Sequence, residues 1–218
     1  MLPHQHEFLK LAVAQEVLRF GNFTLKSGRQ SPYFFNAGLF NSGRAIAALG
    51  GYLAETLMSS GLAFDMLFGP AYKGIPLATA VAIALACDHN RDIPLAFNRK
   101  EAKTHGETGI LIGAPLRGRV LIIDDVITAG TSVRDSVRLI ESHGAQACGV
   151  LIALDRQERG DGSLSAAQEV HQQFGIPVLA IAGLQELLTL ASADSTLIQH
   201  HASLLDYRNR YGVADSGA

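Results

Sequence analysis

Apolar and polar residues follow two alternating patterns along most of the chain. Short, almost wholly apolar runs predict buried strands at residues 66–68, 95–97, 120–123, 148–154 and 178–182. Apolar residues at helical spacing predict helices at residues 44–58, 75–87, 131–143, 163–174, 185–190 and 195–210. Strands that alternate with helices in this way are typical of parallel sheets covered on both faces. The pattern therefore predicts an α/β fold with a central, mainly parallel sheet flanked by helices.

The first 40 residues follow a different pattern. Residues 5–20 carry apolar side chains at helical spacing, and Gly21 and Asn22 end that pattern, which predicts an N-terminal helix. Two short runs rich in aromatic residues, 23–25 and 32–36, flank a polar segment and predict a hairpin. We expect a single domain over residues 1–218, in which residues 1–40 form a small hood of one helix and one hairpin.

Composition and charge limit the classes of function. The chain has 218 residues, 48% of them hydrophobic, and its 18 Lys and Arg against 20 Asp and Glu give a net charge of −2, so no nucleic-acid partner is expected. The longest apolar stretch, residues 75–87, is too short to cross a membrane, and the first residues lack a signal-peptide pattern. We expect a cytoplasmic protein with no membrane partner, in which Cys87 and Cys148 are free, buried thiols.

The ends of the predicted strands carry the candidate chemistry, because ligands of open α/β sheets bind beyond the carboxyl ends of the strands. Residues 120–132 are the most informative: an apolar strand ends in Asp124 and Asp125, and a turn with Gly130 then opens a helix with Thr131 or Ser132 near its N-cap. Such a turn offers free N–H groups, hydroxyls and the positive end of a helix dipole to a phosphate group.

Two carboxylates just before this phosphate site suit the hydroxyls of a phosphorylated sugar and a divalent cation. The segment lacks the Lys and the spacing of a nucleotide P-loop. Taken singly, Asp124 and Asp125 are explained as solvated residues at a strand end, and Thr131 as a helix cap. Their order along the chain favours a binding site.

Residues 120–132 resemble the phosphoribosyl pyrophosphate motif of the type I phosphoribosyltransferases, and their surroundings resemble the orotate phosphoribosyltransferases within that family. Further positions that match are Lys26, Phe34, Phe35, Tyr72, Lys73, Arg99, Lys100, Lys103, His105 and Arg156. The resemblance covers roughly the first three quarters of the chain. It implies the type I phosphoribosyltransferase fold and a pentosyltransferase, in the glycosyltransferase class. The implied reaction joins orotate to phosphoribosyl pyrophosphate, giving orotidine 5′-monophosphate and pyrophosphate in pyrimidine biosynthesis.

The resemblance also implies residue roles. Phosphoribosyl pyrophosphate would contact Lys26, Tyr72, Lys73, Arg99, Lys100, Lys103, His105, Asp124, Asp125, Val126, Ile127, Thr128, Ala129, Gly130, Thr131 and Ser132. Orotate would contact Lys26, Phe34, Phe35, Thr128 and Arg156. Catalysis would depend on Asp124, Asp125 and a proton from Lys103 or His105. Mg²⁺ would be the cofactor, held mainly through the substrate, with Asp124 and Asp125 as candidate ligands in the protein.

The residue types add detail to these roles. The planar fork of Arg156 suits a bidentate pair with the carboxylate of orotate. Phe34 and Phe35 are adjacent on a strand and point to opposite faces, so at most one ring stacks on the base. Residues 99–109 are polar, carry several cations and connect two strands, which is typical either of a solvated connection or of a lid. The resemblance implies a homodimer in which this lid closes over the neighbouring site.

Two alternative functions share the phosphoribosyl motif. The first is a purine phosphoribosyltransferase, which Arg156 and Lys26 disfavour because two cations would face a neutral base. The second is a regulator that senses phosphoribosyl pyrophosphate and binds nucleic acid. The net charge of −2 and the cations of the lid disfavour this regulator.

Overall fold

The computed structural model describes the chain from residue 1 to 213 except residues 26, 104–108, 129 and 161, and of residues 102 and 103 the backbone alone. Its main sheet has six strands in the order β5-β4-β3-β6-β7-β8. Their bounds are β3 Met66–Gly69, β4 Leu95–Lys103, β5 Gly109–Gly113, β6 Arg119–Asp124, β7 Gln146–Asp155 and β8 Val178–Gly183. All neighbouring strands are parallel except β4 and β5, so the prediction of a mainly parallel sheet is confirmed.

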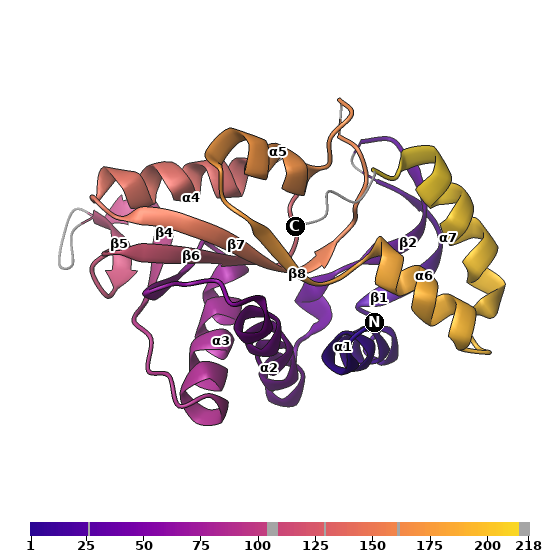
Figure 1. Ribbon diagram of the computed structural model, residues 1–218, viewed down its shortest axis with the longest axis horizontal. Coiled ribbons are helices and arrows are strands. Elements are labelled where there is room, and N and C mark those ends of the chain that lie inside the picture. Colours follow the sequence, from indigo (N-terminus) through magenta and orange to yellow (C-terminus); the bar gives the residue numbers. More distant parts are fainter. Residues whose placement is uncertain (26, 104–108, 129, 161, 214–218) are drawn as a thin grey trace.

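Helices cover both faces of this sheet (Figure 1). One face carries α1 (Pro3–Ala14), α2 (Gly43–Ser60) and α3 (Gly74–Asp88), and the other carries α4 (Thr131–Ser142) and α5 (Ala166–Phe174). Successive residues of β6 serve the two faces in turn: Leu121 and Ile123 belong to the core beneath α2 and α3, and Val120 and Ile122 to the core beneath α4. Two-sided burial explains why the central residues of β3, β6 and β7 are apolar without interruption.

The hood is built from α1 and an antiparallel pair, β1 (Leu18–Thr24) and β2 (Gln30–Phe35). The prediction that the first helix extends to residue 20 is wrong. The helix ends at Ala14, the chain turns at Glu16 with a φ of 54°, and Leu18 then pairs with Phe35 across the hairpin. Leu18 is almost fully buried there, so cross-strand packing overrides its helical spacing.

The last helices, α6 (Leu184–Ala193) and α7 (Ile198–Tyr211), return the chain to the hood, and α7 lies beside β1 and β2 (Figure 1). A short 3₁₀ turn, η1 (Ala37–Leu39), leads from the hood to α2. Edge contact between the rings of Tyr33 on β2 and Tyr207 on α7, 6.0 Å between centroids, joins the two elements. The N-terminal hood and the C-terminal helix α7 are therefore in contact with each other.

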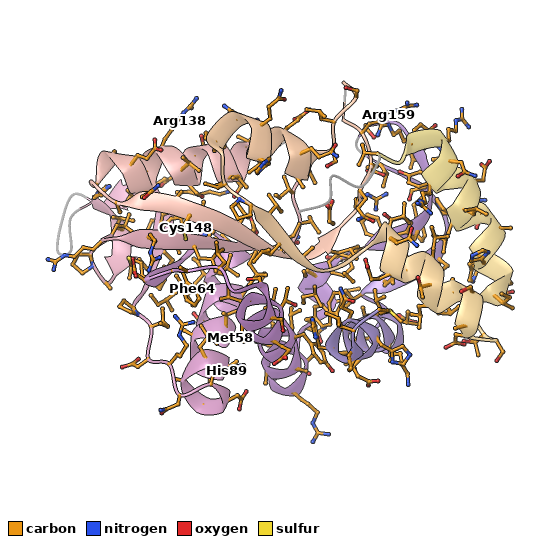
Figure 2. The ribbon with its side chains drawn as sticks, in the orientation of Figure 1. Met58, Phe64, His89, Arg138, Cys148 and Arg159 are labelled. Atoms are coloured by element: carbon orange, nitrogen blue, oxygen red, sulfur yellow. The ribbon has the colours of Figure 1, made fainter. Side chains whose placement is uncertain are left out.

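Two further expectations concern single features. Both cysteines are free, but Cys87 is exposed at the outer end of α3, so its predicted burial is wrong; Cys148 on β7 is half-buried (Figure 2). In the part of the chain that the structure describes, no helix combines the length and the apolar character needed to cross a membrane.

Candidate active site

The carboxylates that follow β6 lie side by side at the carboxyl end of the sheet. Asp124 accepts a hydrogen bond from the backbone N–H of Asp125 at 2.9 Å and another from the hydroxyl of Ser132 at 3.0 Å. Burial raises the pKa of Asp124 to about 6, because the charged form loses hydration and faces a second carboxylate. The segment after β6 therefore brings Ser132 into contact with Asp124, and burial moves the pKa of Asp124 toward neutral pH.

The loop between β3 and α3 meets these carboxylates. Lys73 Nζ lies 2.6 Å from Asp125 Oδ2, with the lysine half-exposed and the carboxylate buried. The Ala71–Tyr72 peptide bond is cis, and the backbone N–H of Ala71 donates to the side-chain oxygen of Asn98 at 2.8 Å. Two strand ends that are far apart in sequence thus place one cation and one carboxylate in direct contact.

The turn after β6 leaves the start of α4 open to an anion. Gly130 is the N-cap, with a φ of +66°, and no side chain of the described residues caps the helix. The prediction that Thr131 or Ser132 lies near the N-cap is confirmed, since they are the first helical residues, and both are exposed, as is Thr128. The first turn of α4 carries no acidic residue, so its free N–H groups and dipole favour a phosphate. The predicted Ala129 falls outside the described residues.

A cation that the sequence analysis did not assign also reaches this turn. Arg134, one turn into α4, donates from Nη2 to the hydroxyl of Thr131 at 3.2 Å. The sequence could have predicted this contact, because Arg134 follows Gly130 by four residues and residues one turn apart share a helix face.

A cavity of about 420 Å³ lies between the β3–α3 loop and the end of β4. Its lining comprises Tyr72, Ile75, Phe97, Asn98, Arg99, Lys100, Glu101 and Ile112. Three predicted contacts of phosphoribosyl pyrophosphate, Tyr72, Arg99 and Lys100, are therefore brought together, and Lys100 Nζ lies 4.9 Å from the centre of the Tyr72 ring. Asp124 and Asp125 do not belong to this lining.

The prediction that residues 99–109 form one long loop is wrong in part. Arg99 and Lys100 lie on β4, which extends to Lys103, and Gly109 begins β5, a strand that the sequence analysis missed. Antiparallel pairing of the two strands makes this segment a hairpin, with Asn98 opposite Leu111. The side chain of Lys103, together with His105 and Lys26, lies outside the described residues.

The candidate contacts of the base lie further along the same edge of the sheet. Arg156, just after β7, donates to Glu158 from Nε at 2.9 Å and from Nη2 at 3.2 Å. The same Nη2 also lies 3.1 Å from the hydroxyl of Ser31 and 3.2 Å from that of Tyr207. Burial alone would lower the pKa of Arg156, yet its tyrosine and glutamate neighbours raise that pKa above its ordinary value.

These contacts change the expected geometry of Arg156. We expected its fork to be available for a bidentate pair with a substrate carboxylate, but the edge formed by Nε and Nη2 already holds Glu158. Nη1 makes no hydrogen bond to the residues that the structure describes. Glu158 lies two residues after Arg156, so the sequence could have indicated that the two side chains meet. Nothing in the sequence indicated that Tyr207 also contacts Arg156.

The two adjacent phenylalanines of β2 have different surroundings. Phe35 packs on Phe8 in the core, with ring centres 6.3 Å apart. Phe34 pairs with Phe23 at 5.6 Å and lies beneath the guanidinium of Arg19. Their opposite orientation agrees with the expectation that at most one of the two rings stacks on a base.

Oxygen ligands for a metal ion are limited in this site. Within the described residues, no group of three or more His, Cys, Asp and Glu side chains is arranged to hold a metal ion. Asp124 and Asp125 supply two carboxylates, which fits Mg²⁺ when phosphate oxygens and water complete its coordination. A cation held chiefly through the substrate suits this pair.

Comparisons with known proteins show the family to which the chain belongs. Residues 38–178 match the phosphoribosyl transferase domain family. Orotate phosphoribosyltransferases from Klebsiella pneumoniae (strain 342) and Pseudomonas fluorescens are 57% and 60% identical over 213 and 214 residues, which is 98% of this chain and 100% of each relative. The crystal structure of the Francisella tularensis orotate phosphoribosyltransferase is 43% identical, with a TM-score of 0.85 over 94% of this chain and 99% of that one. The chain therefore belongs to the phosphoribosyl transferase domain family and, within it, to the orotate phosphoribosyltransferases.

Proposed function

We propose that this chain transfers the ribosyl 5-phosphate group of phosphoribosyl pyrophosphate to orotate, releasing pyrophosphate and forming orotidine 5′-monophosphate. The observation that carries the proposal is the contact between Lys73 and Asp125 beside the open N-terminus of α4. It places a cation, carboxylates and a phosphate site at one edge of the sheet, in a chain whose relatives bear the name of this activity. Residues 1–218 act as one domain, and the reaction is a cytoplasmic step of pyrimidine biosynthesis.

The phosphoribosyl group is held at the end of β6. Residues 128–132 and the first turn of α4 bind its 5-phosphate through N–H groups, hydroxyls and the helix dipole. Asp124 and Asp125 accept hydrogen bonds from the ribose hydroxyls and stabilise the positive charge that develops at the anomeric carbon. Burial raises the pKa of Asp124 to about 6 when no ligand is bound, so at that pH the carboxyl must lose its proton before it can stabilise the positive charge.

The departing pyrophosphate is bound by the loop before α3, where Lys73 turns from Asp125 toward the anion beside the cavity that Tyr72 lines. In the dimer proposed below, Arg99 and Lys100 of the other chain also contact this pyrophosphate. Asp124 and Asp125 are the protein residues that would help to hold Mg²⁺, which would supply positive charge to offset the charge of the departing pyrophosphate. Lys103 or His105 donates a proton to the pyrophosphate as its bond to the anomeric carbon breaks. The ring nitrogen of orotate then bonds to that carbon and releases its own proton to solvent. Lys26, Phe34, Phe35, Thr128 and Arg156 hold the base.

We also propose a homodimer in which residues 99–109 act on the neighbouring site. Exposed apolar side chains support a second copy of the chain as the partner: Tyr72 is 66% exposed and Ile83 on α3 is 59% exposed. Mixing two inactive variants, Lys103→Ala and Asp125→Asn, tests the arrangement. Random reassortment makes half of the dimers mixed, each with one intact site, so activity recovers to roughly a quarter of wild type. No recovery would show that each lid serves its own chain.

The activity itself is tested by the loss of orotate absorbance with purified protein, phosphoribosyl pyrophosphate and Mg²⁺. Adenine, hypoxanthine and uracil, offered as alternative bases, separate this reaction from that of a purine phosphoribosyltransferase. Orotate is expected to be consumed, and adenine and hypoxanthine are not. Turnover of a purine base with no turnover of orotate would refute the proposal. Retention on a phosphate-rich column at moderate salt would favour the nucleic-acid-binding regulator instead.

A further inference from the structure

The loop that carries Arg156 is held from two sides. Arg29 of the hood donates to the backbone carbonyls of Arg159 and, at 2.7 Å, Gly160. Arg159, which Figure 2 shows near the end of α7, donates from Nη2 to the carbonyl of Arg210 at 2.8 Å. An isolated β-bridge joins Glu158 to Gly212. The hood and the C-terminal helix thus fix the backbone on which Arg156 and Glu158 stand.

The side chains of Arg156 and Glu158 form one buried network with three residues from the hood and α7. The guanidinium of Arg156 lies 4.3 Å from the centre of the Tyr33 ring, and the hydroxyl of Ser31 donates a hydrogen bond to the carbonyl of Tyr33 at 2.7 Å. The hydroxyl of Tyr207 donates to Glu158 and accepts from Arg156. Nε and Nη2 are therefore held in place, and Nη1 is the guanidinium nitrogen without a hydrogen bond to the described residues.

The residues of this network come from both inside and outside the segment that matches the shared family domain. Arg156 and Glu158 lie inside the stretch, residues 38–178, that matches the shared phosphoribosyl transferase domain, whereas Ser31, Tyr33 and Tyr207 lie outside it. The phosphate site at α4 and the loop before α3 lie wholly within that stretch. The segments at the two ends of the chain thus meet at Arg156, the residue assigned to the carboxylate of the base.

We propose that Glu158 and Tyr207 are positioning residues for orotate: they hold the fork of Arg156 so that Nη1 faces the substrate carboxylate. This inference rests on the proposed function, in which Arg156 binds orotate. Glu158 fixes the orientation of the guanidinium by a two-point contact. The hydroxyl of Tyr207 donates a hydrogen bond to Glu158, which reduces the repulsion between this carboxylate and that of orotate. The C-terminal helix thereby contributes to the choice of base.

Tyr207→Phe is the central test, because it keeps the ring and its packing and removes only the hydroxyl. We expect the KM for orotate to rise about five- to tenfold, with the KM for phosphoribosyl pyrophosphate and kcat nearly unchanged. Inhibition by uracil, which lacks the carboxylate, stays at its wild-type level. Tyr211→Phe is the matched control on the same helix, since its hydroxyl makes no hydrogen bond to the described residues. An unchanged KM for orotate in Tyr207→Phe, or an equal rise for both substrates, would overturn the inference.

A second variant tests the carboxylate. Glu158→Gln places an amide N–H₂ against the donors of Arg156 or Tyr207, so the KM for orotate rises more than in Tyr207→Phe. Tighter binding of orotate would mean that Glu158 only repels the substrate, and would also overturn the inference. Arg156→Lys tests whether Arg156 binds orotate at all. If the KM for orotate does not rise in this variant, the assignment of Arg156 to the base fails. If the KM for orotate rises in Arg156→Lys but not in Tyr207→Phe, the positioning role of Tyr207 is refuted and the assignment of Arg156 to orotate stands.

Discussion

Gly74, the first residue of α3, has no room for a side chain. A Cβ atom there would lie 2.5 Å from Cδ of Pro70 and 2.6 Å from the backbone carbonyl oxygen of Ile123, where ordinary contacts begin at 3.4 Å. Gly74→Ala must therefore push these atoms apart by about 1 Å, and the atoms belong to a proline ring and a backbone, which yield little. Such overpacking costs roughly 1–3 kcal/mol, and the better helix propensity of Ala offsets at most ~1 kcal/mol of it. We expect a net loss of about 1–2 kcal/mol in the free energy of unfolding.

The functional effect of Gly74→Ala follows from what the displaced segments carry. Pro70 precedes the loop with Lys73, and Ile123 precedes Asp124 and Asp125, so the substitution moves the two halves of the site apart. A misplacement of 1 Å can lower kcat/KM on the order of a hundredfold. Urea unfolding and steady-state kinetics with phosphoribosyl pyrophosphate measure the two effects.

Gly51→Ala is the matched control for this substitution. Gly51 lies inside α2, and a Cβ built there meets no atom within 4 Å. The control variant gains roughly 0.5–1 kcal/mol of stability and keeps its activity, because Ala restricts the unfolded chain and favours the helix. If Gly74→Ala kept wild-type stability and activity, the expected clash would be wrong, since this result would mean that α3 is not held tightly against β6.

Three further predictions concern single residues. Thr131→Asp places a negative charge at the phosphate site and abolishes binding of phosphoribosyl pyrophosphate in calorimetry while the protein stays folded; unchanged affinity would place the phosphate elsewhere. Iodoacetamide at about pH 8 modifies exposed Cys87 well before Cys148, whose pKa burial raises to about 11, as peptide mass spectrometry will show; equal rates would contradict this order. Hydrogen bonds from Arg119 lower the pKa of Asp65 to about 2, so this pair stabilises the fold above the ordinary pKa of about 4 and loses its effect as the pH falls toward 2. The urea midpoints of wild type and Asp65→Asn therefore converge over that range, and a constant difference would argue against the pair.

The pattern of residues along the chain was enough to predict the α/β architecture and the turn that we propose as the phosphate site. Both depend on local pattern: a strand buried on both faces is apolar at every position, and the turn after β6 needs its carboxylates, Gly130 and hydroxyls in one continuous segment. Boundaries were predicted less well where tertiary packing overrode spacing, as at Leu18, which pairs with Phe35. The extension of β4 past Phe97 was not predicted because residues 98–103 are mostly polar. The strand β5 does carry an apolar signal, the three residues from Ile110 to Ile112, but the run is short and was not used.

Only the tertiary structure decided which distant residues meet. Lys73 is 52 positions from Asp125, and Tyr207 is 51 positions from Arg156, yet each pair is in hydrogen-bond contact. No local periodicity encodes such a contact, because it depends on the order of the strands and on the return of α7 to the hood. The sequence could therefore name Arg156, but the packing of the C-terminal helix decided that its fork already holds Glu158 and which nitrogen it presents.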